Sequence, residues 1–148
     1  MNMGRIKVLF VCIHNSARSQ MAEAILNEMG KDLFQAESAG IENGALNPIA
    51  VEVMNEIGID ISGNKTKSVF DLYVQGNVYN YVITVCDASA SERCPVFPGA
   101  LTVKNWDIED PSAFQGTHDQ KIEKVRAVRD QIKERIGVFI EEARNLAA

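Results

Sequence analysis

The chain has 148 residues, of which 46% are hydrophobic and 24% are charged, and its formal net charge is −5 at pH 7. This size and balance predict one globular domain over residues 1–148, and the negative charge argues against nucleic acid or an anionic membrane surface as a partner. No apolar run approaches the roughly 20 residues of a membrane span, and the first apolar stretch is too short for a signal peptide, so we expect a cytoplasmic monomer.

The first predicted elements are a buried strand over residues 7–11 and a helix with apolar residues at helical spacing over residues 22–29. Gly30 is expected to end the helix. Between the two lies the polar segment 12–19, Cys-Ile-His-Asn-Ser-Ala-Arg-Ser. This segment leaves the end of a strand and enters the N-terminus of a helix, where unpaired N–H groups and the positive end of the helix dipole favour an anion. It therefore predicts an anion-binding loop.

The residue types of this loop suit a site that holds a tetrahedral oxyanion and attacks it. Cys12 supplies a thiolate that the loop amides stabilise, and the planar fork of Arg18 binds two oxygens of the anion. Ser19 is placed to donate its hydroxyl to the sulfur or to cap the helix, while Asn15 and Ser16 tolerate a partly left-handed backbone. Such a site predicts attack on phosphorus or arsenic, with an inert buried cysteine as the alternative. The predicted oxyanion-binding residues are Ile13, His14, Asn15, Ser16, Ala17, Arg18 and Ser19.

The rest of the chain alternates strand and helix patterns, which predicts a parallel sheet with helices on both faces, an α/β fold. Helix starts are indicated by Asn47-Pro48, by Ser68 or Thr66, and by a Thr117–Gln120 capping box before the last helix, whose apolar stripe should lie across the sheet. The predicted strands are 34–40, 81–85 and 101–105, and the predicted helices after the first are 48–57, 69–74 and one beginning near residue 118.

Three candidate residues fall at the carboxyl ends of strands, where ligands bind in such sheets. These are Cys12, Cys86 and Asp110, and the last is suited to act as a general acid, although Asp-Pro is also a common turn. With Cys94 the chain has three cysteines, and an odd number argues against a disulfide framework. Reactive, metal-binding and simply buried thiols remain open, but the cysteine spacing is poor for zinc, and we predict no metal site.

The pattern Cys-x5-Arg-Ser after a first strand, followed by Gln20-Met21-Ala22-Glu23, resembles the active-site loop shared by low-molecular-weight protein tyrosine phosphatases and thioredoxin-coupled arsenate reductases. The resemblance implies a low-molecular-weight phosphatase-like fold, a three-layer αβα arrangement with a four-stranded parallel sheet and flavodoxin-like topology. It also implies that Asp110 is the catalytic aspartate after the fourth strand. In the reductases, two further cysteines flank a flexible loop and complete a three-sulfur relay. The segment from Cys86 to Cys94 resembles that loop, although its seven intervening residues make it one residue longer than expected.

The resemblance therefore implies an arsenate reductase that thioredoxin re-reduces, with weak phosphatase activity and no required cofactor. Its catalytic residues would be Cys12, Arg18, Cys86, Cys94 and Asp110. The main alternative is a low-molecular-weight protein tyrosine phosphatase, and a non-catalytic anion or redox sensor is a third. Two unrelated buried thiols at the second and third cysteine positions also remain open.

Four positions weigh on these alternatives. The phosphatases usually carry an aromatic residue after the Asp-Pro, where this chain has Ser112, and Trp106 is either a partial replacement for that aromatic lip or a core residue. His14 stands where the family often has glycine, and we expect a structural hydrogen bond from it rather than proton transfer. Ala17 replaces a cysteine that some members carry, so that position is outside the relay.

Three polar residues match positions at which some relatives stiffen the loop, sometimes around a potassium ion. A structural potassium ion is therefore a possible cofactor, and ordinary surface or capping roles are the alternative. The three residues are Asn15, Glu23 and Ser38.

Overall fold

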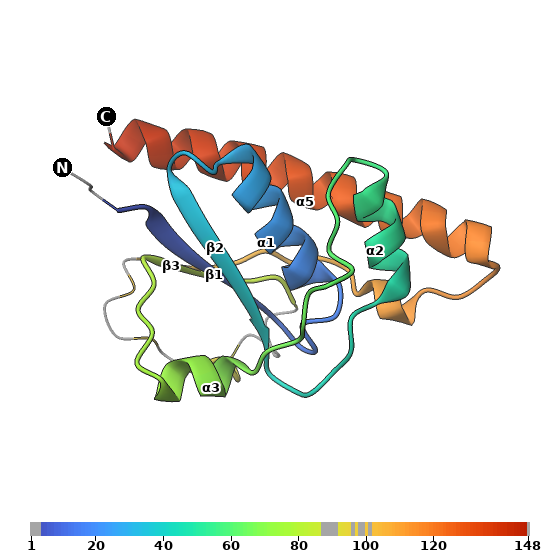
Figure 1. The fold of residues 1–148 in the computed structure, drawn as a ribbon, viewed down its shortest axis with the longest axis horizontal. Helices are drawn as coiled ribbons and strands as arrows, with labels where there is room; N and C mark the ends of the chain where they lie inside the picture. The colour runs from blue at the N-terminus through green and yellow to red at the C-terminus, as the bar shows by residue number, and fades with distance from the viewer. Residues whose placement is uncertain (1–3, 87–91, 96, 98–99, 101, 148) are drawn as a thin grey trace.

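The computed structural model describes residues 4–86, 92–95, 97, 100 and 102–147. Its centre is a four-stranded sheet in the order β2-β1-β3-β4, with every neighbouring pair parallel (Figure 1). This order confirms the predicted flavodoxin-like topology. The strands are β1 (Ile6–Cys12), β2 (Phe34–Gly40), β3 (Tyr81–Thr84) and β4 (Thr102–Asn105).

Helices cover both faces of the sheet, which confirms the three-layer prediction (Figure 1). Three of them, α1, α2 and the long α5, lie over one face, and the short α3 lies over the other. A single 3₁₀ turn, η1, follows β4. The bounds are α1 (Arg18–Met29), α2 (Pro48–Asn55), α3 (Val69–Val74), η1 (Pro111–Ala113) and α5 (His118–Ala147).

Polar side chains fix the starts of α2, α3 and α5, as the sequence predicts. The side chain of Asn47 accepts a hydrogen bond from the Ile49 amide at 2.8 Å, and Ser68 caps α3 in the same way. At α5 the capping box is reciprocal, because Gln120 accepts from the Thr117 amide at 2.9 Å and donates its own amide to the Thr117 hydroxyl at 3.2 Å.

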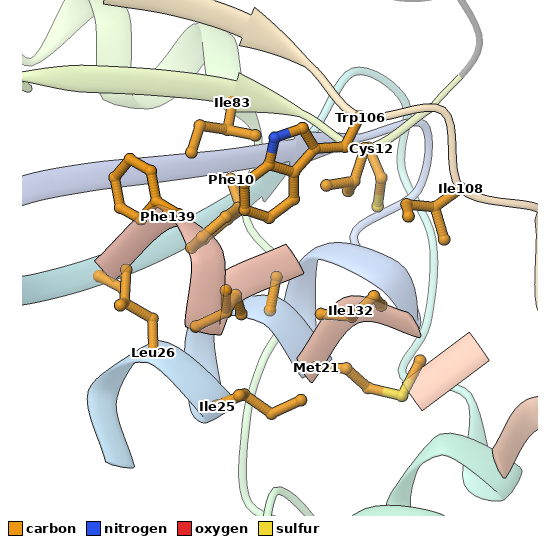
Figure 2. Packing of buried hydrophobic residues seen from close by; sticks show 14 of the residues in the cluster. Phe10, Cys12, Met21, Ile25, Leu26, Ile83, Trp106, Ile108, Ile132 and Phe139 are labelled. Atoms are coloured by element: carbon orange, nitrogen blue, oxygen red, sulfur yellow. The ribbon is translucent and has the colours of Figure 1, made fainter. Parts of the chain in front are cut away.

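The larger of two hydrophobic clusters lies between the sheet and the helices α1, α2 and α5. Figure 2 shows Trp106 in this cluster together with Phe10 and Phe139, and the ring centroids of these two residues lie 5.8 and 6.1 Å from that of Trp106. Trp106 is only 5% exposed, so it is a core residue and does not form an aromatic lip for a substrate. Cys12 belongs to the same cluster, which places its sulfur where the core meets the carboxyl edge of the sheet.

Some sequence predictions lie outside the described residues. These are Leu101, the first residue of the fourth predicted strand, and residues 87–91 of the predicted flexible loop. None of the helices in the described ranges combines the length and the low charge that a membrane-spanning segment needs.

Candidate active site

The loop between β1 and α1 turns sharply around Asn15, whose φ of 55° is left-handed, as the sequence predicts. This turn aims the Asn15 amide at the Cys12 sulfur, 3.1 Å away. The Ser19 hydroxyl lies 2.9 Å from the same sulfur, so Ser19 contacts the thiol rather than capping the helix. The residue at the N-cap is Ala17, which forms no side-chain cap. The sulfur is thus held by two polar contacts while only 2% of Cys12 is exposed.

The carbonyl groups of the loop point away from the sulfur, toward the chain that follows β2. The carbonyls of Cys12 and Ile13 accept hydrogen bonds from the amides of Ile41 and Glu42, and the Ser16 carbonyl accepts from Asn47. In a planar trans peptide the N–H of the next residue points opposite to the carbonyl. The amides that follow these three carbonyls therefore face the interior of the loop, which is the arrangement that an anion requires.

Arg18 lies at the first position of α1 and is 95% buried. One of its terminal nitrogens donates to the Ile108 carbonyl at 3.0 Å, which fixes the direction of the guanidinium. The other lies 3.7 Å from a carboxylate oxygen of Asp110. The structure thus brings the predicted oxyanion clamp and the predicted general acid together at one end of the sheet. Ile108 acts through its backbone carbonyl, which no sequence pattern could have indicated.

The Asp110 carboxylate caps the η1 turn. One of its oxygens accepts from the Ser112 amide at 3.0 Å and from the Ser112 hydroxyl at 2.6 Å. Partial burial raises the pKa of Asp110, but the two bonds from Ser112 and the charge of Arg18 outweigh it, so the pKa lies below its usual value. The surroundings of Asp110 therefore favour its ionised form.

A buried hydrogen-bond network supports the loop from behind. The Asn15 side-chain amide donates to the hydroxyls of Ser19 at 2.7 Å and Ser38 at 3.0 Å. Its oxygen accepts from the Gln20 side chain at 3.2 Å and from the Lys67 amide at 2.9 Å. Asn15 therefore joins the loop to β2 and to the segment before α3. The sequence did not reveal that Gln20 and Lys67 are partners of Asn15.

Two glycines leave room for the loop to pack against the chain after β2. A Cβ on Gly40 would lie 2.8 Å from the Asn15 amide nitrogen, and one on Gly44 would lie 2.6 Å from the Cβ of His14. Neither contact can be relieved by moving the end of a flexible side chain, so a larger residue at either position would displace the loop.

An ion pair network links the loop to the segment that carries the third cysteine. His14 lies 3.4 Å from a carboxylate oxygen of Glu42, and the other oxygen of Glu42 is 2.7 Å from Arg93. The hydrogen bond and charge of Arg93 lower the pKa of Glu42, so Glu42 carries its negative charge at neutral pH. Since Arg93 directly precedes Cys94, this network ties the second half of the predicted relay to the oxyanion loop.

Cys86 and Cys94 are close enough to influence each other. Cys86 is fully buried two residues after the end of β3, and Cys94 is partly buried against the cluster that faces α3. Burial raises the pKa of Cys94 to about 11, and the negative charge of Cys86 adds to this effect. Cys12 lies at the end of β1, the strand that pairs with β3, so the first two thiols share one edge of the sheet. All three are free thiols.

The sequence and the fold are both similar to those of known proteins. The family described as low molecular weight phosphotyrosine protein phosphatase matches residues 7–147. An arsenate reductase from Bacillus subtilis is 40% identical over 134 residues, which are 90% of this chain and 94% of that protein. A solved arsenate reductase in the phosphate binding state has a TM-score of 0.75 at 33% identity and covers 93% of this chain and 98% of its own. A thioredoxin-dependent arsenate reductase from Corynebacterium glutamicum has a TM-score of 0.64 at 26% identity, with 93% of this chain and 65% of that chain covered. The chain belongs to the low molecular weight phosphotyrosine protein phosphatase family, and its relatives there include arsenate reductases.

Proposed function

We propose that this protein is an arsenate reductase that passes electrons through Cys12, Cys86 and Cys94 and is re-reduced by thioredoxin. The observation that carries the proposal is the presence of two further free thiols, Cys86 and Cys94, of which Cys86 follows β3, the neighbour of the strand that ends in the loop cysteine. A hydrolase that works through the loop cysteine alone has no use for them. The similarity to arsenate reductases, one of them thioredoxin-dependent, supports the same reading.

In the first step the loop amides and Arg18 hold arsenate, and the Cys12 thiolate attacks the arsenic atom. A sulfur–arsenic bond forms, and an arsenic–oxygen bond breaks as Asp110 gives its proton to the departing oxygen. The bound arsenate dianion favours protonation of Asp110 in two ways. It pairs with the positive charge of Arg18, which otherwise lowers the pKa of Asp110, and it adds negative charge beside the carboxyl.

In the second step the Cys86 thiolate attacks the Cys12 sulfur. The sulfur–arsenic bond breaks and its electron pair stays on arsenic, so arsenite leaves and a Cys12–Cys86 disulfide forms. Cys94 then attacks the Cys86 sulfur, which releases the Cys12 thiolate and leaves a Cys86–Cys94 disulfide. A dithiol of thioredoxin reduces that disulfide to two thiols and is itself oxidised.

Electrostatics favours this order of events. While Cys86 is ionised, its charge helps to keep Cys94 protonated and therefore unreactive. Once Cys86 has entered a disulfide it carries no charge, and that contribution to the raised pKa of Cys94 disappears. Burial still opposes ionisation of Cys94, so the segment around it must become more exposed before the last exchange.

Phosphatase activity is the second candidate, and the family match favours it. Cys12, Arg18 and Asp110 suffice for phosphoester hydrolysis through a cysteinyl-phosphate intermediate. The site lacks an aromatic lip from Trp106, which is buried in the core, and Ser112 occupies the position after the Asp-Pro. We therefore expect only weak hydrolysis of aryl phosphates.

A coupled assay tests the proposal through arsenate-dependent NADPH consumption in the presence of thioredoxin and thioredoxin reductase. Wild type should consume NADPH, whereas Cys86→Ser and Cys94→Ser should not. Both variants should retain hydrolysis of a small aryl phosphate, which serves as the control for folding and for an intact loop. If both variants keep arsenate turnover with thioredoxin, the relay is wrong. If wild type shows aryl phosphate hydrolysis and no arsenate turnover, the phosphatase reading replaces the reductase.

A further inference from the structure

We propose that the ammonium group of Lys67 is a built-in cation that holds the oxyanion loop in its binding form, so that this protein needs no bound potassium ion there. The proposal rests on the oxyanion-binding role of the loop, which is part of the proposed function, and does not depend on arsenate reduction. Lys67 is a positioning residue in this account, since it acts on the loop through Glu23 and Asn15.

The need for a cation comes from the Glu23 carboxylate behind the loop. Only 19% of the Glu23 side chain is exposed, and the Lys67 ammonium lies 3.8 Å from one of its oxygens. Burial raises the pKa of Glu23, and the Ser38 hydrogen bond and the charge of Lys67 act against that rise. A mostly buried carboxylate is costly without a partner of opposite charge, and Lys67 supplies that charge.

Glu23 in turn anchors the outer end of the hydrogen bonds that reach the nucleophile. The Ser38 hydroxyl donates to Glu23 at 2.5 Å, and Ser38 accepts from the Asn15 amide. The same amide group donates to Ser19, so the Ser19 hydroxyl keeps its own hydrogen for the Cys12 sulfur. An ionised Glu23 takes the hydrogen of the Ser38 hydroxyl, which leaves the Ser38 oxygen to accept from Asn15. The Asn15 amide nitrogen can only donate, so Ser19 accepts from it and directs its own hydrogen to the sulfur.

The backbone of Lys67 adds a second link to the same network. Its amide donates to the Asn15 side-chain oxygen at 2.9 Å, and its carbonyl accepts from the Gly40 amide at 2.7 Å. Gly40 is the residue on which the loop backbone packs. The residue that carries the cation is thus itself fixed to both the loop and the end of β2.

The oxygens that match a potassium site do not fit one in this chain. The Asn15 oxygen already accepts two hydrogen bonds, and the Ser38 hydroxyl is engaged as both acceptor and donor. The carboxylate oxygen of Glu23 that accepts from Ser38 is also the oxygen nearest the Lys67 ammonium, which would repel a second cation. Within the described ranges, no group of three or more His, Cys, Asp or Glu side chains is arranged to hold a metal ion.

The test compares wild type with Lys67→Met, which keeps the length of the side chain and removes its charge. Thermal unfolding and the Kd for inorganic phosphate are measured in about 0.1 M potassium chloride and in tetramethylammonium chloride at the same concentration. Wild type should give the same Tm and Kd in both salts. Lys67→Met should bind phosphate roughly two- to fivefold more weakly in tetramethylammonium, the range that a partly exposed ion pair supports, and potassium should restore part of that loss and raise its Tm.

Two further variants control for folding and for net charge. Lys67→Arg keeps the cation and should behave as wild type in both salts. Lys65→Met makes the same charge change at an exposed lysine two residues earlier, and it should leave the phosphate Kd unchanged. The proposal is overturned if wild type itself gains Tm or affinity from potassium, or if Lys67→Met matches Lys65→Met in both salts. If wild type fails to bind phosphate, the proposed function fails, while the Tm comparison still tests Lys67.

Discussion

Replacing Asn15 measures how much the hydrogen-bond network behind the loop stabilises the protein. Asn15→Ala removes four hydrogen bonds, two donated and two accepted, of which three are buried and one is partly buried. At about 1 kcal/mol of net stability each, their loss costs about 4 kcal/mol. Alanine must also adopt the φ of 55°, which adds about 1 kcal/mol of strain. Asn15→Gly loses the same four bonds but tolerates this φ, so it should be the more stable of the two variants by about 1 kcal/mol.

Equilibrium urea unfolding measures these differences in the free energy of unfolding between wild type and the two variants. The three curves are fitted with one common slope of free energy against urea concentration. A matched control is Asn27→Ala, because Asn27 in α1 forms two hydrogen bonds with the backbone of Ala36 in β2, away from the loop. That variant should lose about 2 kcal/mol and keep the phosphate affinity of wild type. The reasoning is refuted if Asn15→Ala costs less than Asn27→Ala, or if Asn15→Gly is the less stable of the pair.

Three other predictions follow from the contacts of single side chains. Asp110→Asn should slow the burst phase of aryl phosphate hydrolysis by about 10²–10⁴-fold with little change in phosphate affinity, and an unchanged burst rate would exclude Asp110 as the acid. Arg93→Gln frees Glu42 and should speed alkylation of Cys94 a few-fold, as measured by mass spectrometry, whereas equal rates would mean that the ion pair does not restrain this segment. Glu56 forms hydrogen bonds with two arginines that hold its pKa at about 2. The stabilising effect of the Glu56 carboxylate is therefore complete above the ordinary pKa of 4.5 and is lost as the pH falls toward 2. Urea unfolding of Glu56→Gln should therefore show a deficit at neutral pH that vanishes in acid, and a constant deficit across that range would contradict the assignment.

The fold was predictable because its signals are local. Strand β1 is a continuous apolar run because it lies in the middle of the sheet with helices over both faces, and the helix starts carry side chains that cap them. Helix α2 ends at Asn55, earlier than its apolar pattern indicated, because the chain turns through Gly58 at a φ of 80°. Periodicity shows which residues are buried and leaves the last turn of a helix undetermined.

The place of the loop between β1 and α1 was also predictable, because Cys12, Arg18 and Ser19 lie within one short segment whose flanking elements are clear. The contacts that support the loop were not predictable from the sequence. Arg18 is anchored by a backbone carbonyl from the turn after β4, and the loop is linked to Lys67 and Arg93 through side-chain pairs between distant segments. Such pairs follow from how the elements pack in three dimensions, and no spacing in the sequence encodes them.

The central claim, electron transfer through three thiols, is tested most directly by mapping disulfides after a single arsenate turnover without a reductant. Peptide mass spectrometry should find a Cys86–Cys94 disulfide with Cys12 free in wild type, and a Cys12–Cys86 disulfide in the Cys94→Ser variant. Neither disulfide should form without arsenate. Release of arsenite with no disulfide that includes Cys86 would contradict the account.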